Sequence, residues 1–293
     1  MKAQRRAVLI AGPTASGKSA MALARAQRGG GIIVNADAMQ VYSGLRIITA
    51  RPSAEDERLV EHRLYGMVSP ATRFSTGQWL SAVAEVIADA DPARELIFVG
   101  GTGLYFDALT RGFAEVPVIP DAVTAAVQAE IEGLDATARM QRLIAEDPQT
   151  AARLKVADPQ RVIRALAVKR ATGQPLSHFQ QAHMPALLDG WAVGRLVLAP
   201  DREVLRARIT RRFETMFAQG AVEEVENLRA QKLDPSLPAL KAIGVPEISD
   251  WLDGRTGREE AIALSIIATH QYAKRQRTWF RNRMSDWPRL DPL

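Results

Sequence analysis

The sequence predicts an α/β protein with a P-loop parallel sheet core flanked by helices and an all-helical insertion domain. Short apolar runs alternate with amphipathic helical patterns, which is typical of a parallel sheet with right-handed crossovers. The stretch GPTASGKS, residues 12–19, joins the first apolar run to the first helical pattern, as a phosphate-binding loop does. A middle region without strand patterns indicates the helical insertion.

Four apolar or β-branched runs with turn residues behind them predict buried parallel strands. They are residues 7–12, 32–37, 96–101 and 195–200. Helical patterns lie between and after these runs, at 18–27, 76–90, 202–219, 222–231 and from 259 towards 284.

The region between the third and fourth strands predicts short helices only. Their starts, each marked by an Asp beside a proline, lie at 120–121, 147–148 and 158–159. We therefore expect residues 1–116 together with 192–293 to form the P-loop core. Residues 117–191 are expected to form the insertion domain.

Composition excludes several classes of function. The 293 residues include no cysteine, which excludes disulfides, thiol catalysis and zinc-thiolate sites. No apolar run approaches the roughly 18 residues of a membrane span, so we expect a protein that does not bind membranes. We also expect a cytoplasmic location and a monomer. The net charge is +5, and residues 273–283 hold five cations and no carboxylate. Such a concentration of charge indicates a polyanionic partner.

The glycine-rich stretch predicts a cradle for phosphate groups. Its backbone N–H groups and the helix N-terminus favour oxyanions, and Lys18 adds a positive charge. Ser19 offers a hydroxyl to Mg²⁺. The predicted phosphate-binding residues are Gly12, Pro13, Thr14, Ala15, Ser16, Gly17, Lys18 and Ser19.

A carboxylate follows the second predicted strand rather than the third. Loops of this kind usually hold ATP or GTP beside an Asp at another strand end, but the third strand runs into GGTG without an acid. Asp37 instead ends the second strand, at the edge that faces the ligand crevice in such sheets. We predict that Asp37 lies beside the phosphates; a role as a helix N-cap is the alternative.

Five blocks of the chain resemble the bacterial tRNA dimethylallyltransferases, also called tRNA isopentenyltransferases. The blocks are GPTASGKS, NADAMQVY, GGTGLYF, DPQRVIRAL and HQYAKRQRTWFR, in the family's order from residue 12 to residue 281. The resemblance implies that the loop holds the diphosphate of dimethylallyl diphosphate. It also implies transfer of the dimethylallyl group to N6 of the adenine 3′ of the anticodon in tRNA, with release of pyrophosphate.

The resemblance implies roles for residues near the cradle. Asp37 is the candidate base that takes a proton from the adenine amino group, and Lys18 favours departure of the diphosphate. Thr102 approaches the substrate as a third catalytic residue, or alternatively caps the next helix. Gln40 can pair with an adenine edge through two hydrogen bonds, or lie in a solvent-facing turn.

The target adenine has to leave its stack to enter such a crevice. Four residues could stack on it, line a pocket for the isoprenoid tail or belong to the core: Met39, Tyr42, Tyr105 and Phe106.

Two helical segments are expected to face the tRNA anticodon arm. The resemblance assigns RNA contacts to Asp37, Ala38, Met39, Gln40, Gln160, Arg161, Val162, Ile163 and Arg164. Arg161 and Arg164 share one helix face, for which a solvated basic face is the alternative. In the last helix Lys274, Arg277 and Arg281 form a stripe that can follow phosphates, whereas Trp279 is expected in the core. The four histidines show no metal-ligand spacing.

The chain departs from the family pattern at two places. Ala38 stands where the family usually has Ser, so a hydroxyl contact is lost there. Val245-Pro246 stands where an aromatic residue and an arginine are usual, which questions any role of that turn.

Three rival functions stay open on the residues alone. An ATP-dependent small-molecule kinase would keep the loop, but it needs a metal-binding Asp at a strand end and a lid over the nucleotide. The helices with arginines between 206 and 212 could mimic such a lid. An adenylate isopentenyltransferase would use the same donor on AMP without an RNA-binding insertion. A noncatalytic RNA-binding module would not need Lys18, Ser19 and Asp37 around one crevice.

Overall fold

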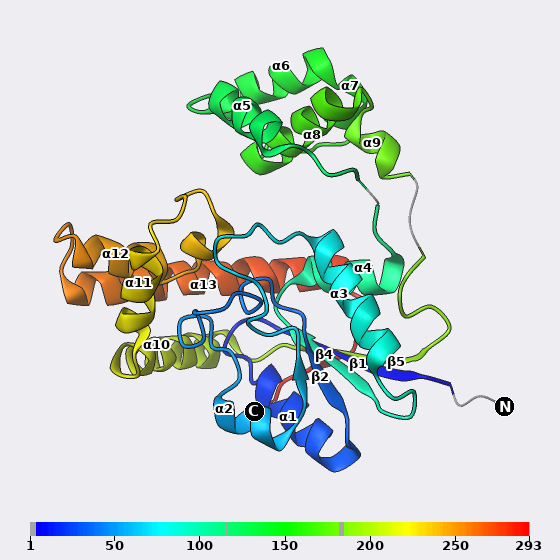
Figure 1. The fold of residues 1–293 in the computed structure, drawn as a ribbon, viewed down its shortest axis with the longest axis vertical. Coiled ribbons are helices and arrows are strands. Elements are labelled where there is room, and N and C mark those ends of the chain that lie inside the picture. Colours follow the sequence, from blue (N-terminus) through cyan, green and yellow to red (C-terminus); the bar gives the residue numbers. More distant parts are fainter. Residues whose placement is uncertain (1–3, 115, 182–184, 293) are drawn as a thin grey trace. The chain divides into compact units, whose positions relative to one another are not determined.

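The computed structural model describes residues 4–114, 116–181 and 185–292 (Figure 1). The chain folds as two compact units. One contains the sheet and is made from residues before 111 and after 186; the other is the helical unit, Arg111–Ala186. Both boundaries of the helical unit lie earlier in the chain than the expected 117–191.

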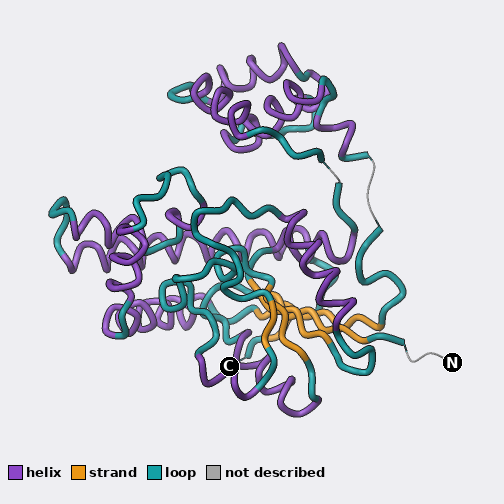
Figure 2. Tube along the Cα trace, viewed as in Figure 1, coloured by secondary structure: helices purple, strands orange, loops and turns teal. Residues whose placement is uncertain are grey.

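A six-stranded parallel sheet forms the centre of the first unit, in the order β3-β2-β4-β1-β5-β6 (Figure 2). The strands are β1 (Arg6–Ala11), β2 (Ile32–Asn35), β3 (His62–Arg63), β4 (Leu96–Gly100), β5 (Ala192–Leu198) and β6 (Arg289–Leu290). The α/β prediction and its four strands are confirmed. The two edge strands have two residues each, too short to produce a period-2 pattern.

The two faces of the sheet contribute to different cores because successive residues of a strand point to opposite sides of the sheet. Leu9, Val34 and Phe98 pack against helices α3 (Thr76–Asp89), α4 (Gly103–Arg111) and α13 (Arg258–Arg283). Ile10, Ile33 and Ile97 pack against α1 (Lys18–Gly29). Figure 1 shows these helices on the two sides of the sheet.

Another core of the first unit, called the second core below, joins the segment after β2 to four helices and to α13. The four helices are α10 (Arg202–Ala218), α11 (Ala221–Ala230), the 3-10 helix η1 (Pro238–Lys241) and α12 (Val245–Leu252). Helix α13 also contributes to the core that contains Leu9, Val34 and Phe98, called the first core below. Of the described residues, those of helix α2 (Ala54–Leu59) contribute to neither of these two cores.

The helical unit contains α5 (Asp121–Ile131), α6 (Ala136–Glu146), α7 (Pro148–Ala151), α8 (Pro159–Thr172) and α9 (Leu176–Phe179). The Asp158 side chain accepts a hydrogen bond from the Arg161 backbone N–H at 3.1 Å and begins α8, which ends at Gly173 with φ of 71°. Apolar residues of α5, α6 and α8 form a separate core. In the described part of the chain, no helix combines the length and apolarity needed to cross a membrane.

Candidate active site

The parallel register brings three loops to one edge of the sheet. Ala11 of β1 pairs with Gly100 of β4, and Asn35 of β2 pairs with Val99. The strands therefore end side by side, and the residues that follow them meet beyond that edge. These are the glycine-rich loop after β1, the segment with Asp37 after β2 and the segment with Thr102 after β4.

The first loop has the backbone geometry of an anion cradle. Ala15 and Gly17 both have positive φ, 62° and 88°, and Lys18 begins α1 directly afterwards. Alternating backbone conformations of this kind turn successive N–H groups towards one point. The buried hydroxyl of Ser16 has no hydrogen-bond partner among the described residues, so a polar group of the loop stays unpaired.

Asp37 is held rigidly at the end of β2 by Asn35. The Asn35 side chain accepts a hydrogen bond from the Asp37 N–H at 2.9 Å and donates to the Asp37 carbonyl at 3.0 Å. Asp37 Oδ1 accepts from the backbone N–H of Met39 at 3.0 Å. Asp37 is therefore not an N-cap of a helix; it stabilises the turn that it begins, and its second oxygen, Oδ2, makes no hydrogen bond within the described chain.

Thr102 fixes the segment after β4 against the Asp37 turn. Its backbone N–H donates to the Ala36 carbonyl at 3.2 Å, and its hydroxyl oxygen accepts from the Ala38 N–H at 2.9 Å. A Cβ atom at Gly100 would lie 1.9 Å from the Ala36 carbonyl oxygen, so glycine alone permits this approach.

These loops surround one cavity of about 550 Å³ in the first unit. Lys18, Ser19, Asp37 and Thr102 line it together with residues of α10 and α13. The remaining lining residues are Thr14, Ala38, Met39, Gln40, Ile48, Thr49, Ala50, Gly101, Gly103, Leu104, Arg212, Phe213, Met216, Lys241, Ala242, Ile243, Thr269, Tyr272, Arg275, Gln276 and Trp279. The cradle and the predicted base thus open into the same space.

Electrostatics mark the same space as a site for an anion. The pKa of Lys18 is lowered to about 8, chiefly by burial; Asp37 opposes this shift and the nearby Arg212 adds to it. Burial also lowers the pKa of Arg212. Two cations held out of water favour a bound polyanion, because an opposite charge offsets their desolvation.

Two inward-facing polar residues that pattern reasoning missed bind the loops. Arg212 on α10 donates to the hydroxyl of Thr14. Gln276 on α13 accepts from the Thr14 N–H at 2.9 Å and donates to the Gly101 carbonyl at 3.0 Å. Both lie in charge-rich helical stretches, where one inward-facing polar residue does not differ in pattern from its solvated neighbours.

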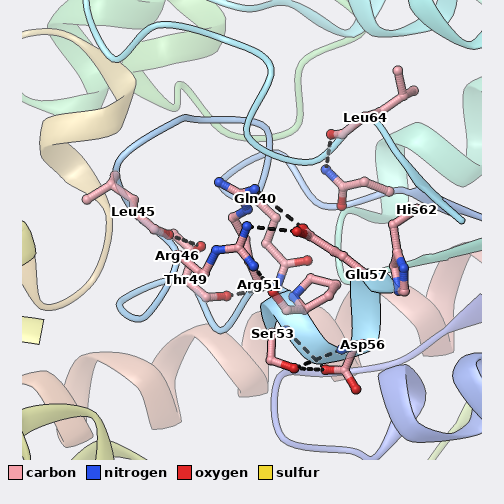
Figure 3. A network of polar contacts seen from close by, with 12 residues as sticks. Gln40, Leu45, Arg46, Thr49, Arg51, Ser53, Asp56, Glu57, His62 and Leu64 are labelled. Carbon is pink, nitrogen blue, oxygen red and sulfur yellow. Dashed lines mark hydrogen bonds and ion pairs between the residues drawn. The ribbon is translucent and has the colours of Figure 1, made fainter. Parts of the chain in front are cut away.

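The structure corrects the expectation for Gln40. Its two amide hydrogens both bond to backbone carbonyls, of Thr49 and Ala50, at 2.8 Å each. Figure 3 shows Gln40 facing this segment, which Arg46, Arg51 and Glu57 support. A two-bond pairing with an adenine edge needs a free donor and a free acceptor, and only the amide oxygen is left for a ligand.

Four proposed stacking residues fall into two groups. Tyr42, Tyr105 and Phe106 are buried in the two cores, with Tyr105 stacked on Trp79 at 4.1 Å between ring centroids. Met39 lines the cavity.

Trp279 packs against the first core and also lines the cavity, so the expectation of a core position describes only part of its surroundings. Tyr272, another aromatic residue of the cavity wall, was missed by pattern reasoning.

The predicted RNA contacts of α8 divide by helix face. Gln160, Arg161 and Arg164 are exposed. Val162 and Ile163 are 0% and 7% exposed in the core of the helical unit, so their side chains are corrected from RNA contacts to packing residues.

The cationic stripe of α13 lies largely at the surface of the first unit. Lys274 and Arg281 are exposed, and Arg277 is half-buried. The following turn of α13 ends at Arg283, whose guanidinium lies 5.8 Å from the Trp279 ring.

The two departures from the family pattern have local consequences. Ala38 uses its backbone N–H to bind Thr102, which needs no side-chain hydroxyl. Val245 and Pro246 occupy the first turn of α12, where Pro fits because its missing N–H has no helical partner. Lys241, Ala242 and Ile243, just before this turn, line the cavity.

Within the described residues, no group of three or more His, Cys, Asp or Glu side chains could hold a metal ion. A metal at this site would therefore depend on few protein ligands.

The sheet, the cradle after its first strand and the shared cavity define a P-loop protein with a site for a phosphorylated substrate. The model of the IPP transferase family matches residues 40–283. A tRNA dimethylallyltransferase from Methylobacterium sp. (strain 4-46) is 52% identical over 98% of this chain and 94% of its own length. The chain belongs to the IPP transferase family.

Solved structures agree with this assignment. The tRNA isopentenylpyrophosphate transferase from Bacillus halodurans is 31% identical, with a TM-score of 0.68 over 98% of this chain and 90% of that one. A eukaryotic dimethylallyltransferase acting on tRNA is 25% identical, with a TM-score of 0.80 over 98% of this chain and 74% of that one.

Proposed function

We propose that this protein transfers a dimethylallyl group from dimethylallyl diphosphate to N6 of the adenine 3′ of the anticodon in tRNA, releasing pyrophosphate. The observation that carries the proposal is the single cavity lined by Lys18 of the cradle and by Asp37. Family membership, with relatives named tRNA dimethylallyltransferase, supports the same activity.

The donor diphosphate binds the loop of residues 12–19. When the bond between the allylic carbon and its oxygen breaks, negative charge grows on the leaving diphosphate. Lys18 and Arg212, both cavity residues, stabilise that charge together with the loop N–H groups.

The residues present fit Mg²⁺ as a partner of the diphosphate. Ser19 lines the cavity at the second position of α1, where its hydroxyl can join diphosphate oxygens and water as a hard oxygen ligand. When bound, the ion supplies further positive charge to the leaving group.

Asp37 receives the proton of the acceptor. The adenine amino group is a weak nucleophile because its lone pair is delocalised, and it gains strength as it loses a proton. Asp37 Oδ2, free of hydrogen bonds within the described chain, takes that proton while the nitrogen bonds to the allylic carbon. The carbon–oxygen bond breaks in the same step, and pyrophosphate leaves with its electron pair.

The adenine reaches the cavity as an extruded base. Met39, Tyr272 and Trp279 supply apolar and aromatic surface in the cavity wall for its ring. The Gln40 amide oxygen is available to accept a hydrogen bond from the amino group.

Ionic contacts hold the RNA. The exposed cations Lys274 and Arg281 follow phosphates along α13, and Arg161 and Arg164 present charge on α8. Gln160 adds an exposed amide beside them.

A direct test offers the purified protein labelled dimethylallyl diphosphate with either tRNA or AMP. Label in tRNA supports the proposal. Label in AMP indicates an adenylate isopentenyltransferase instead. Phosphoryl transfer from ATP without prenylation would indicate a kinase.

A further inference from the structure

The Gln276 side chain connects the phosphate-binding loop after β1 to the segment after β4. It is 5% exposed, in the C-terminal part of α13. Its side-chain oxygen accepts from the Thr14 N–H in the phosphate cradle, and its nitrogen donates to the Gly101 carbonyl after β4. Among the described residues, no other side chain forms hydrogen bonds to both loops.

The bridge lies next to the proposed base. A Cβ atom at Gly101 would lie 2.1 Å from Gln276 Nε2 and 3.2 Å from Asp37 Oδ2. The amide nitrogen and the carboxylate oxygen therefore both lie close to the space that a side chain at Gly101 would fill. A side chain there would displace the Gln276 amide, so glycine keeps the bridge in place beside Asp37.

The other end of the bridge fixes the tip of the cradle. Thr14 is held at two atoms, with its N–H bound to Gln276 and its hydroxyl bound to Arg212. Since the Thr14 N–H is already satisfied, the diphosphate has to use the N–H groups nearer α1. The bridge thereby restricts where the leaving group can lie.

We propose that Gln276 is a positioning residue that sets the separation between the leaving diphosphate and Asp37. This inference rests on the proposed transferase activity. Gln276 lines the cavity, and we assign its effect to its two hydrogen bonds, to Thr14 on one side and to Gly101 on the other. Small errors of placement at reacting centres cost about 100-fold in rate per ångström, so the bridge affects turnover more than affinity.

The test replaces Gln276 by Met, which has similar length and makes neither hydrogen bond. We expect Gln276→Met to lower kcat by about 10- to 100-fold, while KM for tRNA changes by less than about threefold. The control is Gln271→Met, the same substitution at an exposed position of the same helix. It should leave kcat and both KM values unchanged. Thermal unfolding and gel filtration check that each variant is folded.

A second variant covers the case in which Gln276→Met does not fold. Gln276→Glu keeps the side-chain volume and the acceptor for Thr14 but loses the donor to Gly101. We expect a kcat at least about fivefold lower in the folded protein. An unchanged kcat in a folded Gln276 variant would overturn the positioning role, and so would a loss confined to KM for tRNA. If the unsubstituted protein makes no prenylated tRNA, the proposed function fails instead.

Discussion

The Thr102 hydroxyl oxygen accepts a hydrogen bond of 2.9 Å from the backbone N–H of Ala38, the residue directly after Asp37. This bond ties the segment after β4 to the turn that carries the proposed base. Thr102 also lines the cavity, so it can meet a substrate as well as hold the turn. The hydroxyl oxygen thus holds the Asp37 turn, where the expected alternative was a cap on the next helix; the catalytic role of Thr102 stays a prediction.

Thr102→Val tests this bond because Val keeps the shape and removes the hydroxyl. With the Ala38 N–H unpaired, the Asp37 turn loosens, and we expect kcat to fall by about 10- to 100-fold. Thr102→Ser keeps the hydroxyl and should retain most activity. A loss in Thr102→Ser with full activity in Thr102→Val, measured by steady-state prenylation of tRNA, would mean that the methyl group matters instead of the hydroxyl.

Asp37→Asn removes the proposed base and keeps the side-chain size. A general base contributes about 10² to 10⁴ in rate, so kcat should fall by this factor while tRNA affinity stays within about twofold. Filter binding measures the affinity and product formation measures kcat. A fully active Asn variant would exclude Asp37 from proton transfer.

Lys18 should make donor binding sensitive to alkaline pH. Burial lowers its pKa to about 8, so the side chain loses its charge as pH rises through this value. Since the charged form attracts diphosphate, KM for the donor should be lowest below pH 8 and rise above it, by up to about tenfold per pH unit. Lys18→Met should have a high KM at every pH, and the same alkaline rise in this variant would assign the effect to another group.

Gly103→Ala separates helix propensity from packing. In an exposed helix Ala is more favourable than Gly by about 1 kcal/mol. A Cβ at Gly103 would lie 2.1 Å from Trp279 Cδ1 and Nε1, so one of the two residues has to move. We expect a net loss of about 1–3 kcal/mol in the free energy of unfolding, measured in urea, together with altered Trp fluorescence. A gain in stability would show that Trp279 moves freely.

The surface cations of α13 should control the salt dependence of tRNA binding. The double substitution Lys274→Ala/Arg281→Ala removes two exposed charges, and the slope of log K against log salt should become shallower by about 2. Arg28→Ala/Arg58→Ala removes two exposed charges from α1 and α2 and serves as the control. Equal changes in both pairs would indicate an effect of net charge alone.

The sequence predicted the parts of the site that belong to continuous patterns. Lys18 and Asp37 each follow an apolar strand, and parallel strands end at the same edge, so their proximity in one cavity could be expected. Strand β3 could not be predicted, because a two-residue strand is too short to show an alternating pattern.

Contacts between helices that are distant in the sequence could not be predicted from residue patterns. Arg212 and Gln276 look like solvated residues of charged helices, and their inward direction depends on how α10 and α13 pack against the cradle. Gln40 was misjudged for a related reason: the segment that takes its amide hydrogens follows it by about ten residues and has no regular period.

The order of the cavity's parts along the sequence has a consequence for biosynthesis. A nascent chain that has emerged as far as α4 already contains all three loops of the cavity. It lacks Arg212 and Gln276, which bind Thr14, because α10 and α13 are translated much later. Under the proposed function, a nascent chain therefore cannot prenylate tRNA before both helices have left the ribosome.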